Sequence, residues 1–90
     1  MQALIRFDTT NPPGNELELA KYLAKTLEAE GIETILLEPA PNRAAVIARL
    51  RGTGSKRPVM VMAHMDVVGV EREKWSVDPF AGEIRDGYLY

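Results

Sequence analysis

The only histidine of the sequence, His64, stands two residues before a carboxylate, Asp66, at the end of an apolar run. Residues two apart on an extended chain point to the same face, so we expect the two side chains to lie together. A metal-bound imidazole is commonly held at its other ring nitrogen by a carboxylate, which fixes its tautomer and orientation. The spacing therefore fits a metal ligand, His64, with a supporting acidic residue, Asp66.

A structural interpretation of the pair stays open, because an H-x-D pair alone is a weak motif and a histidine at a strand end is often only hydrogen-bonded. The context favours a site. Residues 59–68 read as a buried strand, and burying His64 and Asp66 there without partners would be costly. Ligands in open α/β sheets bind beyond the ends of strands. We therefore expect the end of this strand to place His64 and Asp66 in a cleft.

Composition narrows the function classes. The chain has 90 residues, 46% of them hydrophobic and 27% charged, with a net charge of -2 and no cysteine. A slightly negative chain lacks the excess of basic residues that is typical of nucleic-acid-binding proteins and of proteins that bind anionic membrane surfaces. Without thiolates, a metal site here must use histidine and carboxylate ligands. No leader-like or membrane-spanning segment is visible, which predicts a soluble, cytoplasmic protein, with secretion as the alternative if a helix begins before residue 1.

The first half of the chain contains one firm helix. Residues 1–7 read as a short helical piece, and two consecutive prolines in the turn-rich residues 8–14 end it. That turn is most simply a connecting loop, with a role in lining a cleft as the alternative. The spacing then predicts a helix from Glu16 to Glu30, with Asn15 as N-cap, Glu18 completing a capping box and Gly31 as the stop.

The remaining segments favour strands and turns. Residues 33–38 and 44–50 are strand-like, and their short connection suggests antiparallel neighbours, although their pairing in a mixed sheet stays open. Residues 51–57 form a basic turn without the spacing of a phosphate loop. The mixed charges of residues 71–74 indicate a solvated loop or helical turn.

Residues that favour turns divide the C-terminal part of the sequence. Asp78 is interpreted as a turn residue between Trp75 and Phe80, which most simply cover the edge of a small core and alternatively border a substrate cleft. Asp86 and Gly87 stand between two alternating segments, the strongest short signal for a β-hairpin. No internal repeat or domain boundary is visible, so one α/β unit is predicted.

Several motifs in order resemble one family: N-P-P-G-N-E at 11–16, V-M-V-M-A-H-M-D-V-V at 59–68, W-S-V-D-P-F at 75–80 and E-I-R-D-G-Y-L-Y at 83–90. Together they are similar to the N-terminal part of the dinuclear-zinc exopeptidases and deacylases, which include aminoacylase, acetylornithine deacetylase, succinyl-diaminopimelate desuccinylase and glutamate carboxypeptidase. The resemblance implies an α/β fold, with residues 1–90 the N-terminal part of a three-layer mixed-sheet catalytic domain, truncated. The lid or dimerisation domain is expected outside these residues.

The resemblance also implies roles. His64 matches the family's first zinc ligand, and Asp66 matches the catalytic acidic residue that braces this imidazole. The intact enzyme is expected to hold two Zn²⁺ ions, with Co²⁺ as an alternative metal, and the other ligands and the general-base glutamate are expected beyond Tyr90. A catalytic zinc needs about three protein ligands, so the 90 residues alone should hold metal weakly or not at all.

The implied function is metal-dependent hydrolysis of amide bonds in peptides or N-acyl amino acids by an intact, homodimeric enzyme, with the 90 residues inactive alone. One alternative is a noncatalytic or incomplete relative, in which His64 and Asp66 satisfy only each other. Another is a small-molecule binding module that uses no metal. The residues encoded after Tyr90 distinguish the first two, because a further aspartate, a Glu-Glu pair and a distant histidine would support the enzyme.

Overall fold

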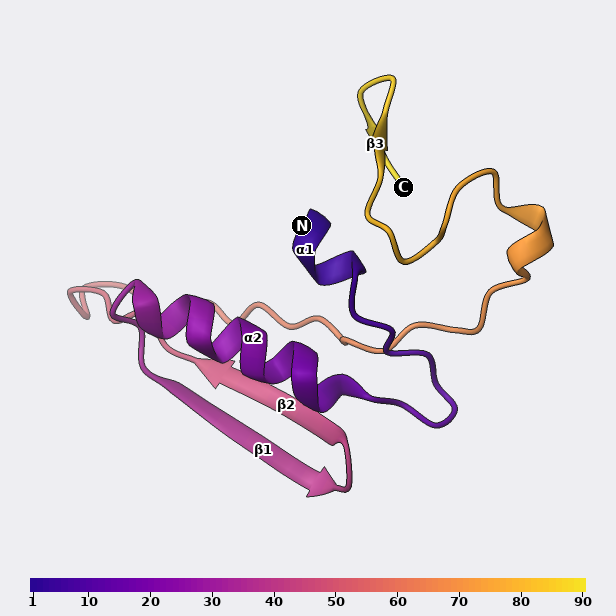
Figure 1. Cartoon of the computed structure of the whole chain (residues 1–90). Coiled ribbons are helices and arrows are strands. Elements are labelled where there is room, and N and C mark those ends of the chain that lie inside the picture. The colour runs from indigo at the N-terminus through magenta and orange to yellow at the C-terminus, as the bar shows by residue number, and fades with distance from the viewer.

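The computed structural model describes all residues, 1–90, as a mixed α/β arrangement with two small antiparallel sheets (Figure 1). The elements in order are α1 (Gln2–Ile5), α2 (Glu16–Ala29), β1 (Thr34–Ala40), β2 (Arg43–Ala48), a 3₁₀ turn (Arg72–Lys74), β3 (Ile84–Arg85) and β4 (Tyr88–Leu89). None of the helices has the length and apolar character needed to cross a lipid bilayer.

Helix α2 packs against the β1–β2 sheet, with its axis running roughly along the strands, and contributes most of the core (Figure 1). Leu19, Ala20 and Ala24 are its buried apolar residues, and they recur at the spacing of one helical face. The two small alanines let the helix backbone approach the sheet closely. The predicted helix is confirmed, with its last residue at Ala29 and Glu30 as the C-cap.

The predicted capping box is wrong. Asn15 is the N-cap, but its side chain makes no cap hydrogen bond, and Glu18 pairs with Lys21 at 2.7 Å. The backbone N–H of Leu17 instead donates to the carbonyl oxygen of Asn42 in the β1–β2 turn at 3.1 Å. A tertiary bond therefore satisfies a helix donor that sequence reasoning assigned to a local cap.

Strands β1 and β2 pair as an antiparallel hairpin, the arrangement that their short connection suggested and that the sequence left open. Their register pairs Thr34 with Ala48 and Leu37 with Ala45, and it shifts between Leu37 and Ala40. The sequence placed Pro39 in the connecting loop, whereas it lies in β1 at this irregularity. Proline has no N–H to donate to a strand ladder, so it is tolerated where pairing is already broken.

The buried strand predicted at residues 59–68 does not form. Val59 and Val61 are 87% and 89% exposed, and the segment pairs only through an isolated parallel bridge between Thr10 and Val67. A strand is stabilised by hydrogen bonds to a neighbour, and no strand of the chain lies beside residues 58–66. The apolar composition was correctly recognised, but the burial inferred from it was wrong.

The C-terminal part follows most of its turn signals. Asp86 and Gly87, both with positive φ (52° and 81°), form the two-residue turn of the β3–β4 hairpin, as predicted. Asp78 is a turn residue, since its Oδ1 accepts the N–H of Phe80 at 3.0 Å. The lid interpretation is wrong for Trp75, which is exposed, whereas Phe80 is half-buried.

Helix α1 and the residue that follows it are hydrogen-bonded to this C-terminal part. The amide of Gln2 donates to the carbonyl oxygen of Gly82 at 2.7 Å, and Arg6 Nε donates to that of Ala81 at 3.1 Å. Figure 1 shows both chain termini on the same side of the molecule, near the β3–β4 hairpin. The loop after α1 then passes the segment that carries His64 and Asp66.

Candidate functional site

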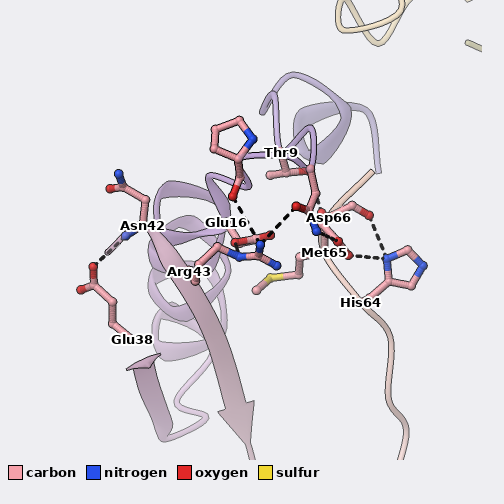
Figure 2. A network of polar contacts seen from close by, with 10 residues as sticks. Thr9, Glu16, Glu38, Asn42, Arg43, His64, Met65 and Asp66 are labelled. Atoms are coloured by element: carbon pink, nitrogen blue, oxygen red, sulfur yellow. Dashed lines mark hydrogen bonds and ion pairs between the residues drawn. The ribbon is translucent and has the colours of Figure 1, made fainter. Parts of the chain in front are cut away.

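The two predicted site residues lie side by side (Figure 2). Nδ1 of His64 is 2.9 Å from Oδ1 of Asp66 and 2.8 Å from the main-chain oxygen of the same residue. The imidazole is exposed, with 84% of its side chain accessible, whereas the Asp66 side chain is 29% accessible. The ring is therefore held at one nitrogen and open to solvent elsewhere.

This geometry fixes the tautomer of a neutral His64 ring. Both atoms that face Nδ1 are oxygens, and a carbonyl or an ionised carboxylate can only accept a hydrogen bond. Nδ1 must therefore carry the proton, and Nε2 keeps its lone pair. An imidazole in this state is a metal ligand through Nε2, with Asp66 in the supporting position that metal-bound histidines usually have.

The loop after α1 holds the segment around Asp66 in place. Asn11 N–H donates to the carbonyl oxygen of Val67 at 2.8 Å, Val67 N–H donates to that of Thr9 at 3.2 Å, and Thr9 Oγ1 donates to that of Met65 at 2.7 Å. Thr9 is only 2% exposed. Of the two interpretations of residues 8–14, lining a site is thus the one that the contacts support.

The side chain of Asn11 completes the surroundings of the carboxylate. Its Nδ2 donates to Asp66 Oδ2 at 2.9 Å, while Asp66 Oδ1 faces His64. The hydrogen bond from Asn11, followed by that from His64, holds the pKa of Asp66 below its ordinary value of 3.8. Asp66 is therefore ionised at neutral pH, as the assignment of the His64 proton requires.

An ion pair lies behind Asn11. Arg43 Nε is 2.8 Å from Oε2 of Glu16, whose side chain is only 5% exposed. The contact lacks the alignment of a hydrogen bond, and Glu16 Oε1 has no hydrogen-bond partner either, so charge attraction is what compensates the buried carboxylate. Arg43 Nη1 also donates to Asn11 Oδ1 at 3.3 Å.

The potential metal ligands of the chain do not form a complete site. No group of three or more histidine or acidic side chains is placed to hold one ion. His64 Nε2 fits zinc as a single ligand because imidazole nitrogen is a preferred donor and its other nitrogen is already braced.

Sequence reasoning missed Asn11, Arg43 and Glu16. It treated Asn11 as part of the turn-rich residues 8–14 and Arg43 as part of the connection between two strands. Glu16 carried a usable signal, because it precedes Leu19 and Ala20 by three and four residues and so shares their buried helix face. A carboxylate on such a face requires a partner.

No protein-family model matches the chain, but individual proteins are similar to it over nearly its whole length. It is 38% identical over 95 residues to succinyl-diaminopimelate desuccinylase from Methylorubrum extorquens, a match that covers 99% of this chain and 23% of that enzyme. It is 30% identical over 93 residues to N-formyl-4-amino-5-aminomethyl-2-methylpyrimidine deformylase from Halalkalibacterium halodurans, covering 99% of this chain and 22% of that enzyme.

A third relative is the human N-fatty-acyl-amino acid synthase/hydrolase PM20D1, which is 31% identical over 74 residues, covering 81% of this chain and 15% of that protein. The chain spans about a fifth of the length of the two bacterial enzymes. These relatives belong to one family although their names state different substrates. The chain therefore belongs to the M20 peptidase family, the exopeptidases and deacylases that its motifs resemble.

Proposed function

We propose that the complete protein carrying these 90 residues is a metal-dependent hydrolase that cleaves the amide bond of N-acyl amino acids or peptides. The observation that carries the proposal is the His64 ring, whose Nδ1 faces two acceptors and whose Nε2 is exposed and free to bind a metal. The names of the relatives, a desuccinylase, a deformylase and an acyl-amino acid hydrolase, support hydrolysis of acyl groups on nitrogen.

The wider setting of the site is part of the same proposal and depends on the family resemblance. Residues 1–90 would form the N-terminal part of a three-layer mixed-sheet catalytic domain, with the lid or dimerisation domain elsewhere. The resident metal would be Zn²⁺, two ions per enzyme, with Co²⁺ as the alternative. We propose a cytoplasmic homodimer as the working form.

In this mechanism the residues of the chain prepare one metal ligand. His64 would offer the Nε2 lone pair to the metal, and Asp66 accepts the hydrogen bond from Nδ1–H, which makes the imidazole a stronger donor and fixes its plane. Bound zinc would contribute Lewis acidity, which polarises the amide carbonyl and favours deprotonation of the attacking water. The family resemblance implies that proton transfer to the leaving nitrogen is carried out by a glutamate expected beyond Tyr90.

The test uses the complete protein with N-succinyl and N-acyl amino acids and with dipeptides. We expect hydrolysis that a chelator removes and Zn²⁺ restores, and that is absent in His64→Ala. The ratio of rates on the acyl amino acids and dipeptides distinguishes a deacylase from a peptidase. Hydrolysis that resists chelation, or that His64→Ala retains, would contradict the proposal, and no hydrolysis by a zinc-loaded protein would favour a noncatalytic relative.

A further inference from the structure

Residues of the N-P-P-G-N-E motif converge on one arginine from another element, Arg43 of β2. Arg43 donates to Asn11 Oδ1 and to the carbonyl oxygen of Pro13, each at 3.3 Å, and pairs with Glu16 Oε2 at 2.8 Å. Gly14 leaves room for the guanidinium, since a Cβ atom there would lie 2.7 Å from Arg43 Cζ. The motif therefore forms a seat for this side chain.

The seat determines which way the Asn11 amide points. A guanidinium can only donate hydrogen bonds, so the Asn11 atom that faces Arg43 must be the oxygen. The amide nitrogen then faces Asp66 Oδ2, at 2.9 Å. A reversed amide would place its N–H₂ against Arg43 and its oxygen against a carboxylate, losing both bonds. Arg43 thus fixes Asn11 as a donor to Asp66.

We propose that Asn11 is a positioning residue for the Asp66–His64 pair and that Arg43, seated against Glu16, sets the direction of its amide. With Oδ2 of Asp66 bound by Asn11, Oδ1 is left turned toward Nδ1 of His64, and Nε2 stays the free nitrogen. The part of this inference that concerns zinc rests on the proposed function. The part that concerns the His64 tautomer does not.

The contacts separate this role from a structural one. The loop is docked onto the His64 segment by two backbone hydrogen bonds and the Thr9 hydroxyl, none of which uses the Asn11 side chain. Removing that side chain should leave the loop in place, free the Asp66 carboxylate and remove one of the three contacts of the Arg43 guanidinium. A substitution of Asn11 therefore tests the orientation of the Asp66 carboxylate and the His64 ring with little change in the fold.

The test compares Asn11→Ala and Asn11→Asp with Asn15→Ala, an exposed asparagine whose side chain makes no cap hydrogen bond. His64 is the only histidine, so ¹⁵N-histidine labelling of the 90-residue chain reports on one ring. At about pH 9, where imidazole is neutral, we expect the Nδ1–H form in the wild type and the control. We expect both Asn11 variants to lower the Nδ1–H population in part, because the carboxylate is freed while the main-chain oxygen of Asp66 still accepts from Nδ1. Wild-type tautomer populations in both variants would overturn the inference.

Zinc affinity of the complete protein provides the second measurement. We expect about a tenfold loss in Asn11→Ala and wild-type affinity in Asn15→Ala, at the lower end of what partners of metal ligands contribute. Asn11→Asp keeps the shape and the acceptor for Arg43, so it decides the matter if Asn11→Ala fails to fold. Unchanged zinc affinity in folded variants would overturn the positioning role. If the wild type binds no zinc, the proposed function fails and the tautomer measurement still decides the present inference.

Discussion

At the scale of single residues, the site is one imidazole prepared by one carboxylate. The Asp66 carboxylate serves two donors, with Oδ1 facing His64 and Oδ2 facing Asn11. Each oxygen therefore has a defined partner, which restricts rotation of the carboxylate. The restriction passes to the ring of His64, whose exposed Nε2 has no partner in the chain. The spacing of an H-x-D pair predicts this contact, since it is local.

Replacement of Asp66 tests the support that it gives to the metal ligand. Asp66→Asn has nearly the same shape but only one acceptor atom for two donors, so either His64 or Asn11 loses its bond. We expect Asp66→Asn and Asp66→Ala to lower zinc affinity of the complete protein by about 10- to 100-fold. Asp86→Asn, at the exposed hairpin turn, is the control and should keep wild-type affinity. Equal affinities in all four proteins would exclude the supporting role.

At the scale of elements, the loop of residues 8–14 connects α1, α2, β2 and the His64 segment. Its backbone docks onto residues 65–67, while Gly14 and Glu16 accommodate Arg43. Sequence patterns predicted α2 and the β3–β4 turn, and only suggested that β1 and β2 are antiparallel neighbours, because these features depend on periodicity, loop length or turn residues within one segment. They missed Asn11 and Arg43 as site residues, because the contact between them spans 32 positions and leaves no periodic signal.

Gly14→Ala tests the seat of Arg43. Gly14 has a φ of +80°, and an added Cβ would lie 2.7 Å from Arg43 Cζ, so both strain and a clash are introduced. We expect the free energy of unfolding to fall by about 1–3 kcal/mol in urea titrations. Gly54→Ala is the matched control, because Gly54 also has a φ of +80° but nothing within 4 Å. A cost no larger at Gly14 than at Gly54 would show that Arg43 is not confined there.

The pair of Arg72 and Asp78 predicts a pH dependence of stability. Arg72 Nη1 donates to Asp78 Oδ1 at 2.9 Å, and this bond, with that from the Phe80 N–H, lowers the pKa of Asp78 from 3.8 to about 2. A carboxyl whose pKa is lowered by folding stabilises the folded state above its unfolded pKa. That stabilisation is lost as the pH falls through the folded value.

The corresponding experiment compares the wild type with Asp78→Asn in urea titrations across this range. We expect the wild type to be the more stable protein above about pH 4 and the difference to diminish toward about pH 2. Both side chains are at least half exposed, so the difference should be small and should decrease with added salt. A difference that stays constant between these pH values would contradict the pairing.

At the scale of the whole molecule, the chain buries little of its apolar surface. Nine of 90 residues are buried, and the radius of gyration is 15.7 Å, against about 12 Å for a compact domain of this length. Residues 59–62 are among the most exposed hydrophobic positions. The composition of these residues is typical of a strand. Composition does not reveal, however, whether another strand lies beside them to accept and donate the ladder hydrogen bonds.

Hydrogen exchange tests this description of residues 59–63. In the 90-residue chain, we expect their amides to exchange at nearly the rate of an unfolded chain, while the amides within α2 are protected. In the complete protein, we expect protection comparable to that of a paired strand. Strong protection of residues 59–63 in the 90-residue chain would mean that they already pair, contrary to the exposed segment described above.

The zinc content of the complete protein with and without the His64 ring is the most direct test of the central claim. Purified wild type and His64→Ala are dialysed against the same zinc-buffered solution, and bound zinc per chain is measured by atomic spectrometry. We expect the wild type to retain zinc and His64→Ala, still folded by circular dichroism, to retain less. Equal zinc content in the two folded proteins would contradict the assignment of His64 as a metal ligand.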